Sequence, residues 1–104
     1  MPRMPILEPD EMTPAQRQVH DKIVAGPRGR SAGIFNMLIN SPTLADMTQQ
    51  VGAYIRYGSK LSDRMRELAI CISSANSKAD YEWRVHSVLA VKAGVPEATL
   101  RSIG

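Results

Sequence analysis

Residues 62–95, SDRMRELAICISSANSKADYEWRVHSVLAVKAGV, decide the fold, because they encode two helices separated by a short polar break. Ser62 can cap a helix that we expect over about residues 63–75. A second helix is expected over about residues 78–93, where Gly94 suits the left-handed conformation that ends many helices. The break, ANS, would fold these helices into a hairpin.

The second helix of this hairpin carries two titratable groups on one face. Glu82 and His86 are four residues apart, so they lie one turn from each other. Leu89, Ala90 and Ala93 fall in the same arc, which places the pair on a stripe that should be buried. Partial burial suits carboxyl and imidazole groups to proton transfer. The alternative is a structural Glu–His pair that fixes helix packing.

The first helix of the hairpin adds a third candidate, Glu67. It shares a stripe with Cys71 and Ser74, and the hairpin would bring it toward the second helix. The core face of this helix is expected to consist of Met65, Leu68, Ala69 and Ile72. The alternative for Glu67 is a surface position, paired with Arg64 or Arg66.

Outside the hairpin the pattern is also helical. Residues 1–12 should form an irregular arm, and Thr13 with Gln16 makes a capping box for a helix over 14–25. Further helical segments are expected over 34–39, over 42–58 and after Pro96. No stretch alternates as a strand does. We therefore predict an all-α fold of four to five helices, with residues 1–104 forming a single domain.

Composition excludes several classes of protein. The 104 residues carry a formal net charge of +3, which is too small and too scattered for a nucleic-acid interface. One cysteine allows no disulfide within the chain. No apolar stretch is long enough to span a membrane. We expect a cytoplasmic protein that binds neither nucleic acid nor membrane.

Three motifs in this region, RELAI (66–70), YEWRVH (81–86) and AVKAGV (90–95), resemble the core signature of the carboxymuconolactone decarboxylase family. The family is part of the alkyl hydroperoxidase D-like superfamily, and the resemblance covers about residues 30–104. It implies a small helical domain that assembles into trimers or hexamers.

The family includes proteins with a CxxC pair, which reduce hydroperoxides, and a branch that lacks this pair. The hydroperoxidase pattern has a Glu, a CxxC pair and a His, and it places the Glu at Glu67 and the His at His86. Its two cysteine positions fall on Ala79 and Glu82, so this chain resembles a branch that lacks the pair. Disulfide cycling needs two thiols. Cys71, outside the motif, is expected to be a buried packing residue.

The predicted function is that of a cofactor-free lyase of the decarboxylase type, acting on a small carboxylated lactone or carbonyl acid. The resemblance implies His86 as general acid/base and Glu82 as its partner or a second proton carrier. Glu67 would orient His86 or bind substrate. Two alternatives remain open: a hydroperoxide reductase, as family membership suggests, and a non-catalytic or truncated member of the family.

The loop GPRGRSAG, residues 26–33, carries Arg28 and Arg30 between glycines. Arginine holds carboxylates with two parallel hydrogen bonds, so this loop could bind an anionic substrate. The alternative is a solvated surface loop. His20 is expected to face solvent, and the spacing of the histidines predicts no metal site.

Overall fold

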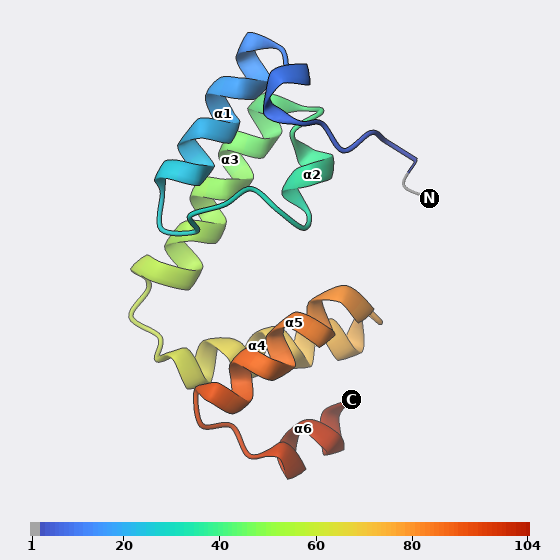
Figure 1. Cartoon of the computed structure of the whole chain (residues 1–104). Coiled ribbons are helices and arrows are strands. Elements are labelled where there is room, and N and C mark those ends of the chain that lie inside the picture. The colour runs from blue at the N-terminus through green and yellow to red at the C-terminus, as the bar shows by residue number, and fades with distance from the viewer. Residues whose placement is uncertain (1–2) are drawn as a thin grey trace. The chain divides into compact units, whose positions relative to one another are not determined.

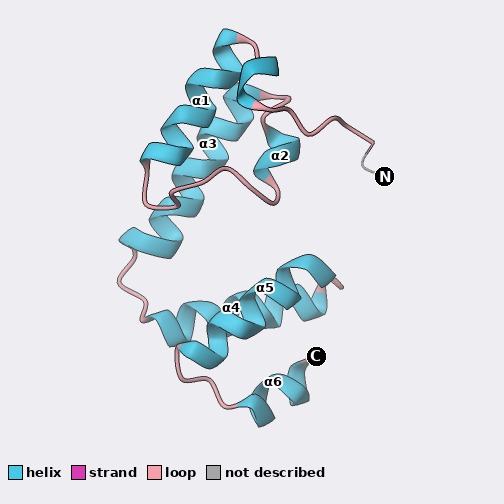
Figure 2. Ribbon diagram, viewed as in Figure 1, coloured by secondary structure: helices cyan, strands magenta, loops and turns pink. Residues whose placement is uncertain are grey.

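The structure is a computed structural model that describes residues 3–104. Within those residues it contains six α-helices and no strand (Figures 1 and 2), which confirms the predicted all-α fold. The helix count exceeds the predicted four to five because the short segments expected over 34–39 and after Pro96 each form a helix of their own. The chain divides into two compact units, one ending at Gly58 and one formed by Ser59–Gly104. The single domain over residues 1–104 stays a prediction.

The first unit contains three helices: α1 (Pro14–Ala25), α2 (Phe35–Leu38) and α3 (Pro42–Ala53). The predicted capping box begins α1, since the Thr13 side chain accepts from the Gln16 backbone N–H and the Gln16 side chain accepts from that of Thr13. α3 continues as a π-helical turn, Tyr54–Gly58, and so ends where the sequence predicts. Both α1 and α2 pack on α3.

The core of the first unit lies between these three helices. Its buried residues are Val19, Ile23, Phe35, Ile39 and Ala45. The N-terminal arm is tied to this core, because Leu7 and Met12 pack against it. A 3-10 turn, Pro9–Glu11, gives the arm regular structure that the sequence does not predict.

The second unit contains the predicted hairpin, α4 (Asp63–Asn76) and α5 (Asp80–Lys92), followed by α6 (Glu97–Ile103). α4 and α5 lie side by side and α6 packs on α4 (Figure 1). The Ser62 side chain accepts from the Met65 backbone N–H and caps α4 as expected. Gly94, with a φ of 98°, takes the predicted left-handed conformation after α5.

The face of α4 that is buried differs from the one predicted. The buried residues are Glu67, Cys71 and Ser74, whereas Met65 is 56% and Ile72 49% exposed. The predicted core face was wrong for Met65 and Ile72 but right for Leu68, which packs against the core. α4 turns its polar stripe toward α5, where Glu67 meets His86. A buried carboxylate needs such a partner. The periodicity of apolar residues along one helix does not predict a partner on another helix.

Buried residues from both arms of the hairpin and the chain after it make up the core of the second unit: Cys71, Ala90, Val95 and Leu100, with Leu68 and Trp83 packed against them. Among the helices of residues 3–104, none has the length and apolar character needed to cross a membrane.

Candidate active site

Glu67 and His86 meet in the interior of the second unit. Glu67 Oε2 lies 2.6 Å from His86 Nδ1, and the two residues are only 2% and 7% exposed. α4 contributes the carboxylate and α5 the imidazole. The hairpin thus brings together two residues that the sequence proposed for one site.

Arg66 extends this pair toward the surface. Its Nε donates to Glu67 Oε1 at 3.3 Å, and its Nη1 donates to Asp63 Oδ1 at 3.0 Å. The second oxygen of the buried carboxylate is therefore also satisfied, as a buried charge requires. Asp63 and Arg66 were not among the predicted site residues. Asp63 lies three residues before Arg66 on one helix, and this spacing could have predicted their ion pair. From the sequence, Arg66 was considered only as a partner for Glu67 at the surface.

Glu82 lies on the other side of the imidazole. Its Oε2 is 3.5 Å from His86 Nε2, and its side chain is 41% exposed. The predicted alignment of Glu82 with His86 on one face of α5 is confirmed in geometry. The two carboxylates flank one ring, with Glu67 enclosed and Glu82 open to solvent.

The two ring nitrogens of His86 differ in their hydrogen-bonding partners and therefore in their protonation. A carboxylate can only accept hydrogen bonds, so we assign the proton of the short contact to Nδ1, which donates to Glu67. In the neutral imidazole Nε2 then keeps its lone pair and can take up a proton. Nε2 faces Glu82, whose side chain is the most exposed of the three.

Cys71 lies one turn beyond Glu67 on α4 and has no exposed surface. Burial raises the pKa of the Cys71 thiol, and the negative charge of Glu67 raises it further. Both effects disfavour the thiolate, which is the reactive form. The structure agrees with the prediction that Cys71 is buried and packs in the core.

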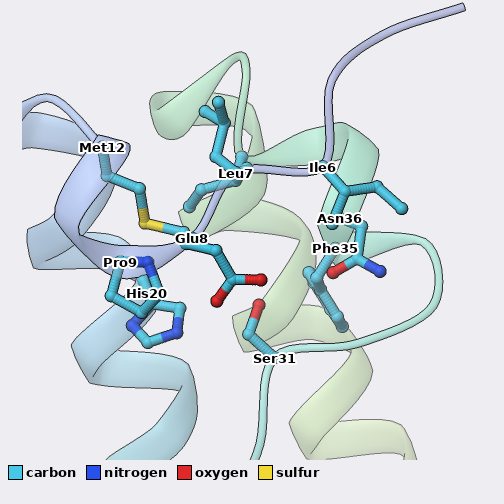
Figure 3. Close-up of a pocket in the computed structure, with 10 residues that line it drawn as sticks. Ile6, Leu7, Glu8, Pro9, Met12, His20, Ser31, Phe35 and Asn36 are labelled. Carbon is cyan, nitrogen blue, oxygen red and sulfur yellow. The ribbon is translucent and has the colours of Figure 1, made fainter.

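His20, the second histidine, does not face solvent as predicted. Its side chain is 17% exposed, and Nδ1 lies 3.1 Å from Asp21 Oδ1. The ring lines a hollow of about 220 Å³ in the first unit, between the N-terminal arm and the helices (Figure 3). The arm covers His20, which sequence periodicity could not foresee. Figure 3 also shows the Glu8 carboxylate and the Ser31 hydroxyl directed into this space.

Arg28 and Arg30, the predicted carboxylate clamp, belong to the first unit, whereas Glu67, Glu82 and His86 belong to the second. The Arg28 guanidinium lies over the Phe35 ring, 4.8 Å from its centroid, and Arg30 is exposed. Binding of substrate by these arginines stays a prediction. No group of three or more His, Cys, Asp and Glu side chains within residues 3–104 is placed to hold a metal ion.

A family model matches more than half of the chain. Residues 42–103, from α3 to α6, match the carboxymuconolactone decarboxylase family. The protein therefore belongs to this family. The family-level resemblance read from three motifs is thereby confirmed. Neither a curated protein nor a solved structure matches the chain.

Proposed function

We propose that this protein is a cofactor-free lyase that decarboxylates a small carboxylated lactone or carbonyl acid by Glu/His proton transfer. The observation that carries the proposal is the buried contact of 2.6 Å between Glu67 Oε2 and His86 Nδ1. A carboxylate held against one ring nitrogen leaves the other nitrogen free for acid/base work. Membership of the family supports the class of reaction.

In the proposed reaction His86 protonates a carbanion. The bond between the substrate carbon and its carboxylate breaks, CO2 leaves, and the electron pair stays on the substrate as an enolate-like anion. The imidazolium Nε2–H gives its proton to that carbon, which yields the product and neutral His86. Glu82, 3.5 Å from Nε2, then returns a proton from solvent to the ring.

Glu67 acts through His86 in this scheme. Its negative charge stabilises the imidazolium that the protonation step requires, and its short contact fixes the orientation of the ring. Arg66 holds the other carboxylate oxygen at 3.3 Å, which restrains Glu67 in turn. Glu67 is therefore proposed as a positioning residue, with His86 and Glu82 as the proton carriers.

The structure favours this chemistry over hydroperoxide reduction. The one thiol, Cys71, is buried with a raised pKa, and the family's cysteine positions hold Ala79 and Glu82. A purely structural role would require the buried pair of Glu67 and His86 but not the partly exposed Glu82 on the second ring nitrogen.

The proposal includes a homo-oligomer, trimer or hexamer, in the cytoplasm. α5 leaves an apolar stripe of Tyr81, Val85 and Val88 exposed, and α4 does the same with Met65 and Ile72. Contiguous apolar surface of this kind commonly marks an interface between proteins. Sedimentation or native mass measurement tests it, and a monomer at micromolar concentration would contradict it.

The activity is tested with His86→Gln, assayed by release of CO2 from a carboxylated lactone. Glutamine can still donate to Glu67, so the fold should persist, and circular dichroism checks this. We expect the rate to fall on the order of a hundred- to ten-thousand-fold. The matched control is His20→Gln, which changes the other histidine and should leave the rate unchanged. An unaltered rate in His86→Gln would refute the proposal.

A further inference from the structure

Arg28 lies in the loop over residues 26–33, and its side chain reaches α3. Its guanidinium lies over the ring of Phe35, a core residue of the first unit. Its Nη2 comes so close to the helix that a Cβ built on Gly52 would lie 2.5 Å from it. Only a residue without a side chain leaves room for the guanidinium at this distance.

Arg56 follows Gly52 by four residues, so it projects from about the same side of the helix one turn later. Its guanidinium is 5.2 Å from the centroid of the Tyr57 ring. The two cations are close enough to interact: burial lowers the pKa of Arg28 most, and the charge of Arg56 lowers it further, against an opposite effect of Tyr57. Two like charges thus share one partly buried patch.

Within residues 3–58, no carboxylate forms an ion pair with either guanidinium. Asp21 is bound by Arg17 and His20, and Asp46 by Lys22. Glu11 accepts from the Glu8 backbone N–H. The Glu8 carboxylate is directed into the hollow beside Ser31 (Figure 3), and Asp10 is exposed in the N-terminal arm. Among the described residues, neither Arg28 nor Arg56 has an ion pair, and the Nε of each is buried without a hydrogen-bond partner.

We propose that Arg28 and Arg56 form a binding site for a small oxyanion, a carboxylate or a phosphate, on the face of α3 that Gly52 leaves open. Guanidinium groups match the geometry of such anions with paired hydrogen bonds. A bound anion would relieve both the repulsion between the two cations and their incomplete solvation. The site lies in the first unit and does not depend on the proposed acid/base chemistry of Glu67 and His86, so either proposal can fail alone.

Binding is measured by titrating the folded chain with inorganic phosphate and, separately, with succinate, each against sodium chloride at equal ionic strength. The readout is the set of arginine Nε–H resonances in ¹H–¹⁵N spectra, assigned to the two residues through Arg28→Gln and Arg56→Gln. We expect saturable shifts of both resonances with at least one oxyanion, and the two titrations show which one the site prefers.

Three variants test the geometry. Arg28→Gln and Arg56→Gln should each weaken binding roughly tenfold or more, because a charge-assisted contact is lost. Gly52→Ala keeps every charge but displaces the Arg28 guanidinium, and it should weaken binding by a similar factor. Alanine favours helix, so this variant is expected to fold, and circular dichroism verifies that.

Arg3→Gln is the matched control, since it removes the same charge from the first unit at an exposed position. It should leave the affinity within about twofold, because screening limits the effect of a distant exposed charge. Equal weakening by Arg3→Gln would show that binding depends only on net charge and would overturn the proposal. Shifts that fail to saturate with either anion, or full affinity in Gly52→Ala, would overturn it as well.

Discussion

Glu67 Oε2 lies 2.6 Å from His86 Nδ1 across the two helices of one hairpin, and both side chains are almost fully enclosed. The contact places charge in the core of a small unit, where an unpaired charge would be costly. It also leaves His86 Nε2 facing Glu82 at 3.5 Å. The contact between Glu67 and His86 explains why the polar face of α4 is buried. It also explains why proton transfer is proposed to run through Nε2 and Glu82.

The first prediction concerns the contribution of this pair to stability. Glu67→Gln and His86→Gln should each lower the free energy of unfolding by about 1–3 kcal/mol, because each leaves a buried polar partner poorly satisfied. The double variant should cost less than the sum, with a coupling of about 0.5–3 kcal/mol. Urea unfolding followed by circular dichroism measures all four proteins.

The control for that cycle is Glu97→Gln. Glu97 pairs with Arg101 at 3.8 Å, and both side chains are exposed. Its loss should change the free energy of unfolding by less than about 0.5 kcal/mol. Strictly additive effects of Glu67→Gln and His86→Gln would show that the buried contact contributes no coupling.

The second prediction separates Glu82 from Glu67. Glu82 is 41% exposed and its contact with His86 is long, so Glu82→Gln should leave the free energy of unfolding within about 0.5 kcal/mol. As a proton carrier it should nevertheless lower kcat on the order of a hundredfold, with a smaller effect on KM. Steady-state kinetics beside urea unfolding tests both parts, and a normal kcat would remove Glu82 from the mechanism.

The third prediction concerns Cys71. Its thiol is buried and its pKa is raised, first by burial and then by Glu67. In the native protein it should react with a thiol reagent at least tenfold more slowly than in urea, since the thiolate is the reactive species. Peroxide with a dithiol donor should be consumed no faster than without protein. Peroxide turnover that is lost in Cys71→Ala would instead favour the hydroperoxidase alternative.

The fourth prediction concerns acid stability. Lys22, Gln49 and Gln50 all donate to the carboxylate of Asp46, and these hydrogen bonds lower its pKa. A lowered folded-state pKa stabilises the protein above the unfolded value of about 3.9, and this stabilisation is lost as the pH falls through the folded pKa. The Tm of Asp46→Asn should therefore lie below that of the parent at pH 6, and the gap should close toward pH 2.

Asp10→Asn is the comparison for this pH series. Asp10 is an exposed acid, and no described residue forms an ion pair with it. Its Tm difference from the parent should stay small from pH 6 to pH 2. A gap for Asp46→Asn that does not vary with pH would contradict the role assigned to its carboxylate.

The family, the helical hairpin and the three residues that meet at the His86 ring could all be read from the sequence. The Ser62 cap, the Gly94 terminus and the spacing of Glu82 from His86 depend on local geometry, which neighbouring residues largely determine. The capping box at Thr13 is local in the same way. Such features follow from the chain itself, and the structure places each of them where the sequence indicated.

The packing was decided only by the tertiary structure. Whether Glu67 or Met65 faces α5 depends on a partner from another helix, because a buried carboxylate is tolerated only where a histidine or arginine meets it. The covering of His20 by the N-terminal arm and the approach of Arg28 to Gly52 depend in the same way on segments remote in the chain. Periodicity within one helix records its apolar and polar faces, but it does not record which neighbour will satisfy a charge.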